Sequence, residues 1–188
     1  MTGVKHGTVR LEPHQETWRE EAEQAIGLLR RLLDGTAVDI QHVGSAAIRG
    51  IHAKPILDIA VAVRSLEEIQ PHAEDLKRYG ILFRGEAVAG ELLFVMERQG
   101  LRTHHIHVVV QNDRKWSDYL DFRDYLNAYP EKAAQYDACK QSLARQFPQN
   151  RPQYTAGKQQ TIARLLAEAR TWRQSAEQTG PSSCGRRP

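Results

Sequence analysis

Apolar positions in the first half of the chain alternate between a helical and a strand-like spacing. Residues 16–33 carry them at every third or fourth position, which predicts an amphipathic helix. Residues 37–43 and 56–63 are short and rich in β-branched side chains, which predicts two strands. From residue 66 to about residue 79 the spacing is helical again and ends at a glycine. The pattern therefore predicts helix, strand, strand, helix.

The second half opens with a hairpin pattern and then becomes helical. Residues 92–98 and 102–110 predict two antiparallel strands joined through Gln99-Gly100, and residues 9–11 predict a short edge strand. Three further helices are expected, over residues 117–128, 130–147 and about 152–173. Together these elements predict an α+β fold, with a mixed sheet flanked by helices and a helical C-terminal part.

The length of the chain fits one compact domain. With 188 residues, 40% of them apolar and 26% charged, the composition is that of an ordinary globular protein. We expect a single domain over residues 1–175. Residues 176–188 are small, polar and interrupted by glycine and proline, which predicts a disordered tail.

Charge and hydropathy narrow the class of partner. The net charge of +3, from 26 basic and 23 acidic residues, is too balanced for a nucleic-acid-binding surface. No apolar run approaches the ~20 residues of a membrane span, and the first residues lack a signal-peptide pattern. Cys139 and Cys184 lie far apart in the sequence, so no disulfide framework is indicated. We therefore expect a cytoplasmic protein, and the small positive charge leaves a weak preference for anionic ligands open.

A glycine-serine turn followed by a strand aspartate is the first candidate for chemistry. Gly44 lets backbone N–H groups approach a phosphate, and Ser45 adds a hydroxyl donor beside them. Strand alternation puts Asp58 on one face with two alanines, as though room were left for a ligand. An acid within an apolar strand is costly without a partner or a metal. The alternative interpretation is that Asp58 only caps a turn or pairs with Lys54.

The second candidate is a pair of histidines on the predicted strand 102–110. His105 and His107 point to the same side, opposite Ile106, and lie roughly 7 Å apart at a rise of ~3.3 Å per residue. Both imidazoles can then reach one metal ion, or one can bind a metal and the other a phosphate. The alternative is a pair of hydrogen-bonded histidines on a half-exposed sheet.

Several basic residues are candidates for neutralising a phosphate. Lys54 stands four residues before Asp58 and is placed either to pair with it or to meet a phosphate. Arg102 precedes the two histidines. Lys140 and Lys158 each follow a tyrosine by four residues on a predicted helix, and such a pair is more often packing than a binding site.

These residues resemble a known family. The matching segments are His42-Val43-Gly44-Ser45, Ala53-Lys54-Pro55-Ile56-Leu57-Asp58-Ile59, Arg102-Thr103-His104-His105-Ile106-His107-Val108, Phe122-Arg123-Asp124-Tyr125-Leu126, Tyr136 with Lys140, and Tyr154-Thr155-Ala156-Gly157-Lys158. In order and spacing, over about residues 8–170, the chain resembles the GrpB family (also called UPF0157) of the nucleotidyltransferase superfamily. The resemblance implies the polymerase-β-like nucleotidyltransferase fold.

The resemblance also implies roles for particular residues. In the superfamily a glycine-serine turn holds the triphosphate, and two alternate acids on the next strand with a third from a later strand bind two metal ions. Gly44 and Ser45 match the turn and Asp58 matches the first acid, which places Ser45 and Asp58 at the reacting phosphates. His105 or His107 stands where the third acid is expected.

The chain departs from that pattern at three positions. Ala60 occupies the place of the second acid, which weakens one of the two metal positions. Ala46 replaces a threonine that is usual in the family and removes a hydroxyl donor. Arg49 replaces a proline and adds a cation near the turn.

Two functions follow as expectations. The first is a metal-dependent nucleotidyltransferase-like protein that acts on a nucleotide and an unknown small-molecule acceptor. In it Mg²⁺ or Mn²⁺ is held by Asp58 with His105 or His107, and the phosphates are met by Gly44, Ser45, Lys54, Arg102, Lys140 and Lys158. The second is a catalytically degenerate module that binds a nucleotide or another phosphorylated small molecule. The residues do not identify the base, the acceptor or the oligomeric state.

Overall fold

The computed structural model describes residues 2–5, 7–86 and 88–179. The strands are β1 (Ala37–Val43), β2 (Leu57–Val63), β3 (Ile81–Phe83), β4 (Glu91–Arg98) and β5 (Leu101–Val110). The helices are α1 (Thr17–Leu32), α2 (Ala73–Arg78), α3 (Arg114–Ala128), α4 (Pro130–Gln146), α5 (Arg151–Gly157) and α6 (Gln159–Thr179). Two 3₁₀ segments are η1 (Ser45–Ala47) and η2 (Leu66–His72).

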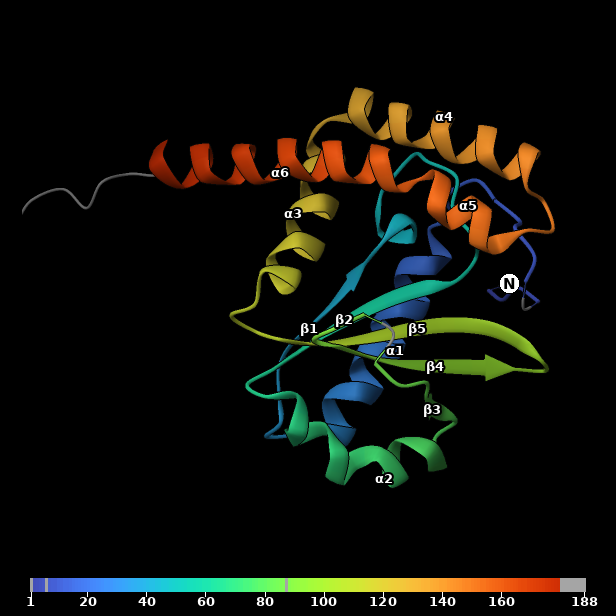
Figure 1. The fold of residues 1–188 in the computed structure, drawn as a ribbon. Helices are drawn as coiled ribbons and strands as arrows, with labels where there is room; N and C mark the ends of the chain where they lie inside the picture. The colour runs from blue at the N-terminus through green and yellow to red at the C-terminus, as the bar shows by residue number, and fades with distance from the viewer. Residues whose placement is uncertain (1, 6, 87, 180–188) are drawn as a thin grey trace, which may run out of the picture.

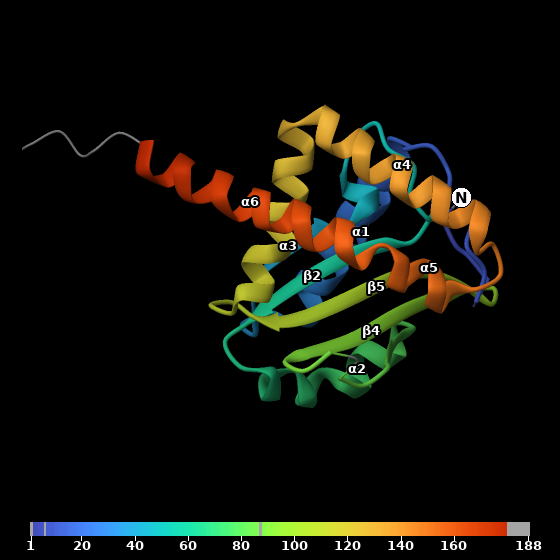
Figure 2. The same cartoon turned by 45° about the horizontal axis from the view of Figure 1, so that its top comes forward.

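Within the described residues the strands form one five-stranded mixed sheet in the order β1-β2-β5-β4-β3. β2 and β5 run parallel, and the other neighbouring pairs run antiparallel. Helices α1 and α2 lie on one side of the sheet, whereas α3 to α6 lie on the other (Figures 1 and 2). The predicted α+β fold with a helical C-terminal part is therefore confirmed.

The two faces of the sheet have separate cores. On the α1 side, the alternate apolar residues of the central strands pack against α1 and η2 in the largest cluster, which includes Trp18, Leu29, Ile59, Val61, Ile69, Ile106 and Val108. On the other side, Ala60, Ala62 and Val109 pack against Trp116 of α3. The alternation that was predicted for β2 and β5 is thus what divides their side chains between the two faces.

The parallel pairing of β2 with β5 positions the chemically active residues. In its register, Asp58 lies opposite His105 and Ala60 lies opposite His107. Adjacent strands are roughly 4.8 Å apart, so these side chains stand in direct reach of one another on the same face. Two segments that are far apart in sequence are therefore brought together by the central pair of the sheet.

The C-terminal helices form a third cluster over the segment that follows β1. Ile48 and Ile51 of this segment pack against Tyr125, Leu126, Tyr136 and Leu165 of the helices. Arg170 of α6 makes paired hydrogen bonds of 2.7 and 2.6 Å to the carboxylate of Asp118 on α3. In the described part of the chain, no helix has the length and apolar character to cross a bilayer.

Several predicted elements differ in detail. Residues 9–11 form no strand. The N-terminal segment instead makes two isolated antiparallel bridges, between Val4 and Arg102 and between Glu12 and Ala53. The predicted helix 66–79 is η2 followed by α2, because Pro71 cannot donate the hydrogen bond that a continuous α-helix requires. The predicted helix 152–173 is the pair α5 and α6, and β3 was not predicted.

The predicted tail overlaps the last helix. α6 continues to Thr179, so the start of the segment that was predicted to be disordered is helical. Residues 180–188 lie outside the described residues.

Candidate active site

The turn after β1 brings the backbone of Gly44 directly against Asp58. Gly44 has φ of 71°, a left-handed conformation that favours glycine, and it leads into the 3₁₀ segment η1. A Cβ atom at this position would lie 2.8 Å from Cβ of Asp58 and closer still to its carboxylate oxygen. Only glycine fits between the turn and the acid, so the predicted proximity of turn and aspartate is a feature of the fold.

Asp58 is paired with both histidines of the predicted pair. Nδ1 of His105 donates to Oδ1 of Asp58 at 2.9 Å, and Nε2 of His107 lies 3.5 Å from the same oxygen. Among the described residues Asp58 makes no ion pair with Lys54. The structure therefore brings together the glycine turn, Asp58 and both imidazoles, as expected.

A second carboxylate, which the sequence analysis missed, completes this group. Glu91, the first residue of β4, accepts a hydrogen bond of 2.8 Å from Nδ1 of His107. Its other oxygen accepts one of 3.1 Å from the hydroxyl of Tyr119 on α3. The predicted strand begins at residue 92 and leaves Glu91 outside it. The available signal is an acid that directly precedes a run of five apolar residues.

Burial and pairing shift the protonation of this group in opposite directions. Burial alone would lower the pKa of His107, but hydrogen bonds to Asp58 and Glu91 raise it to about 9. Burial would raise the pKa of Asp58, but hydrogen bonds from His105 and His107 hold it well below its usual value. For His105, burial prevails over the neighbouring acid and lowers the pKa. The result is an ionised aspartate between a charged and a neutral imidazole.

The donor atoms of this group fit a divalent metal ion. Asp58, His105 and His107 each offer one ligand atom, and these atoms all lie within 4.8 Å of one another. Two imidazoles and one carboxylate suit Mn²⁺ better than Mg²⁺, because Mg²⁺ strongly prefers oxygen ligands. Glu91 would support the metal site without binding the metal itself. Its carboxylate holds Nδ1 of His107, which fixes the orientation of the ring and leaves Nε2 for the metal.

A pocket of about 300 Å³ opens beside the acid and the turn. Its polar wall holds Gly44, Ser45, Asp58, Glu91, Lys115, Asp118, Tyr119, Tyr136 and Lys158, and its apolar wall holds Phe122, Ile162 and Leu166. The hydroxyls of Ser45 and Tyr136 lie 3.2 Å apart. Helices α3 and α6 thus cover the ends of β1 and β2 and leave a small mixed cavity, as small-molecule sites usually have.

The space expected above the two alanines of β2 does not exist. Ala60 and Ala62 are fully buried under Trp116, together with Val43 and Val109. The expectation that this whole face is open was wrong, because α3 packs on it. The cavity is limited to the end of β2 that carries Asp58.

A cluster of cations lies next to the histidines. The ammonium groups of Lys54 and Lys158 lie 5.4 and 4.8 Å from the ring centre of Tyr154. Burial, with the charges of Lys158 and Arg151, lowers the pKa of Lys54 to about 8. Arg151 also reaches Nε2 of His105 at 3.5 Å. Cations that crowd one another in this way favour the binding of an anion between them.

Two of the predicted phosphate-binding residues lie elsewhere. Lys140 is 1% exposed, donates to the carbonyl oxygen of His52 and ion-pairs with Asp137 at 3.7 Å. Mainly because of burial, its pKa is lowered to about 7. Arg102 pairs with Glu97 at 3.0 Å and does not line the cavity, although its charge, after burial, helps to lower the pKa of Arg151.

Comparison with known proteins identifies relatives of the whole fold. Residues 8–168 match the sequence model of the family described as GrpB protein. The glutamate-rich protein GrpB of Alkalihalophilus pseudofirmus is 36% identical over 173 residues, which are 89% of this chain and 99% of the relative. The crystal structure of GrpB from Enterococcus faecalis superposes with a TM-score of 0.80 at 27% identity and covers 87% of this chain and 99% of its own.

A more distant structure shares the fold alone. The Cid1 poly(U) polymerase with bound Mg 3′-dATP superposes with a TM-score of 0.51 at 16% identity, over 71% of this chain and 43% of the polymerase. The sheet and its flanking helices therefore have the arrangement that is found in part of this poly(U) polymerase.

Proposed function

The chain belongs to the GrpB family, and from this premise we propose that it is a metal-dependent nucleotidyltransferase-like protein that acts on a nucleotide and a small-molecule acceptor. The observation that carries the proposal is the close contact between the Gly44 turn and Asp58. An anion-binding backbone turn and a metal-binding carboxylate there face one small pocket. Transfer of a phosphorylated group requires both functions at the same place.

The turn and the lysines would hold the phosphates. The backbone N–H groups after Gly44 and the hydroxyl of Ser45 are donors of the kind that bind phosphate oxygens. Lys158 lines the same pocket, and Lys54 contacts the Tyr154 ring that Lys158 also contacts. A bound triphosphate would offset the mutual repulsion of these cations, which gives the site its preference for an anionic ligand.

Asp58, His105 and His107 would hold the metal ion, with Mn²⁺ favoured by the donor set. A divalent metal supplies charge that stabilises the phosphate oxygens during transfer. The protein's own contribution is to fix the ligands: the 2.8 Å hydrogen bond of Glu91 holds His107, and the glycine turn holds Asp58.

The reaction exchanges one phosphorus–oxygen bond for another. A hydroxyl oxygen of the acceptor bonds to the α-phosphorus of the nucleotide, and the bond to pyrophosphate breaks. The hydroxyl proton is lost to solvent, and pyrophosphate leaves with the electron pair. The apolar wall of Phe122, Ile162 and Leu166 would exclude water from the acceptor's place and limit hydrolysis.

A second candidate function rests on Ala60. This residue stands where the superfamily's second acid is expected, and it is sealed under Trp116 with no exposed surface. A second metal ion therefore has no ligand from β2 at this point. The observation favours a module that binds a nucleotide or another phosphorylated small molecule without transferring it.

One experiment separates the two functions. The protein is incubated with α-³²P-labelled nucleoside triphosphates, Mn²⁺ or Mg²⁺, and a panel of hydroxyl-bearing acceptors. The transferase is expected to label an acceptor, and Asp58→Asn is expected to abolish the labelling. Asp75→Asn is the matched control, because Asp75 is an exposed acid that pairs with Arg78 on α2. Equal labelling by wild type and Asp58→Asn would contradict the role given to Asp58.

Calorimetry with non-hydrolysable nucleotides covers the second candidate. Binding that requires Asp58 without labelling of any acceptor would support the module. Absence of binding to any nucleotide or phosphorylated metabolite would contradict both functions.

A further inference from the structure

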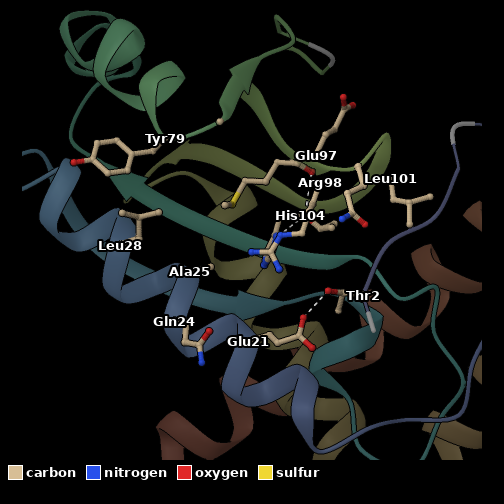
Figure 3. Close-up of a pocket in the computed structure, with 14 residues that line it drawn as sticks. Thr2, Glu21, Gln24, Ala25, Leu28, Tyr79, Glu97, Arg98, Leu101 and His104 are labelled. Carbon is tan, nitrogen blue, oxygen red and sulfur yellow. Dashed lines mark hydrogen bonds between the residues drawn. The ribbon is translucent and has the colours of Figure 1, made fainter.

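A second pocket lies on the opposite face of the sheet from the candidate active site. Its volume is about 570 Å³, and it is formed between α1 and the tip of the β4–β5 hairpin (Figure 3). Thr2 and Tyr79 line it at opposite ends (Figure 3). The volume is in the range of small-molecule sites. The proposed nucleotide chemistry uses no residue of this pocket.

Two opposite charges face this pocket without being paired to each other. Glu21 of α1 accepts a hydrogen bond of 2.5 Å from the hydroxyl of Thr2, and among the described residues it makes no ion pair. Arg98 at the end of β4 likewise makes none within the described part of the chain. The neighbouring Glu97 is already bound by Arg84 and Arg102. One anion and one cation are therefore free for a ligand.

The pocket wall also contains a buried hydrogen-bond acceptor. The hydroxyl of Thr103 donates to the carbonyl oxygen of Met96 at 3.2 Å, so it accepts from Nδ1 of His104 at 2.9 Å. In the neutral ring this leaves Nε2 as an acceptor. His104 is 8% exposed, and its Nε2 has no partner among the described residues. An unpaired buried acceptor is costly. Because this nitrogen is almost fully covered, His104 contributes its ring to the pocket wall and makes no direct contact with a ligand.

Between these polar groups the pocket is apolar. Ala25 and Leu28 of α1 face Met96 and Leu101 of the hairpin. In Figure 3 Arg98 and His104 extend from the hairpin, and Glu21 of α1 lies across from them. Tyr79, which is 56% exposed, offers an aromatic surface at the rim. A ligand with an apolar side chain of moderate size fits such a wall.

We propose that this pocket binds a small zwitterion with an apolar side chain, an α-amino acid or a dipeptide. Its ammonium group lies toward Glu21, and its carboxylate lies toward Arg98. Glu21 would repel a purely anionic ligand, and Arg98 would repel a purely cationic ligand. A molecule that carries one charge of each sign satisfies both residues.

The proposal is tested by NMR titration of the ¹⁵N-labelled full chain, without nucleotide or metal. L-leucine, L-methionine and leucyl-leucine are expected to shift the amide signals of the pocket residues. L-leucinol lacks the carboxylate and 4-methylpentanoate lacks the ammonium group. Each is expected to bind about tenfold more weakly than L-leucine, because one charged contact is lost.

Two variants and a control locate the binding. Glu21→Gln and Arg98→Gln are each expected to weaken L-leucine binding by about tenfold. Glu20→Gln changes an exposed neighbour on the same helix and is expected to leave binding unchanged. Thermal melts of the three variants establish that each is folded. The proposal is overturned if no probe shifts the pocket amides, or if Glu21→Gln binds L-leucine as well as Glu20→Gln does.

Discussion

Strand alternation places Asp58 and Ala60 on the same face of β2, but the structure gives the two positions different surroundings. At one end Asp58 borders a pocket and is paired with two imidazoles. Two residues further on, Ala60 is sealed beneath Trp116 with no exposed surface. Of the residues on this face of β2, only Asp58 therefore borders the pocket. The second carboxylate of the site comes from β4, as Glu91, and not from β2.

The same contrast recurs in the two tyrosine–lysine pairs. Lys140 follows Tyr136 and Lys158 follows Tyr154 at the same spacing, and each ammonium group lies over its ring, at 4.7 and 4.8 Å. Lys140 is sealed in the helical layer, whereas Lys158 lines the pocket beside Asp58. The same spacing therefore places one lysine in the packed interior of the helical layer and the other at the wall of the pocket.

The largest expected effect comes from placing an acid in the sealed region. Ala60→Asp restores the acid that the superfamily pattern expects, but it buries a further negative charge under Trp116, where the neighbouring His107 is already held by Asp58 and Glu91. We expect the free energy of unfolding to fall by about 4 kcal/mol, with no gain in transfer activity. Urea denaturation and the labelling assay measure the two quantities. A stable variant with raised activity would show that this region is open after all.

The next largest effect is expected at the glycine turn. Gly44→Ala adds a Cβ atom against Asp58 at a residue with φ of 71°. We expect the free energy of unfolding to fall by about 3 kcal/mol and nucleotide binding to be lost. Gly50→Ala is the matched control, because Gly50 has φ of 74° and nothing within 4 Å of the added atom. It is expected to cost about 1 kcal/mol from backbone strain alone. Equal losses for the two variants would mean that the contact with Asp58 has no consequence.

Glu91→Gln sharpens the role of the second carboxylate. It removes the charge that holds His107, so we expect the affinity for Mn²⁺ to fall about tenfold while the fold is retained. Titration followed by electron paramagnetic resonance gives the affinity. Glu97→Gln is the control on the same strand, since Glu97 pairs with Arg84 and Arg102. Unchanged Mn²⁺ affinity in Glu91→Gln would contradict the proposal that Glu91 supports metal binding through His107.

The smallest effect is expected from the sealed lysine and depends on pH. The pKa of Lys140 is lowered by burial from 10.5 to about 7, so above pH 7 the unfolded chain holds a proton that the folded chain has lost. Stability therefore rises with pH through this range. Relative to Lys140→Met, wild type is expected to gain about 1 kcal/mol between pH 7 and 8. Parallel pH profiles from urea denaturation would contradict a buried, titrating Lys140.

Much of the fold could be predicted because the signals are local. Strands β1, β2, β4 and β5 follow from alternation and from the Gln99-Gly100 hairpin. β3 has only three residues, which is too short for any alternation to be recognised. Pro71 and the break before α6 divide helices that apolar spacing alone reads as continuous.

The candidate site could be predicted only where its residues are carried by local patterns. Gly44, Asp58 and the histidine pair were found because turn chemistry and strand alternation place them on one face. Glu91 was missed because its partner, His107, lies on the neighbouring strand. Which residues of β2 are covered by Trp116 depends on how α3 packs, and no spacing in the sequence encodes that.

The most direct test of the site is a crystal structure with Mn²⁺ and a non-hydrolysable nucleoside triphosphate, read by anomalous scattering at the manganese edge. We predict a manganese peak within bonding distance of Asp58 and at least one of His105 and His107, with the triphosphate on the turn at Gly44 and Ser45. A manganese peak elsewhere, or a nucleotide bound away from this turn, would contradict this prediction.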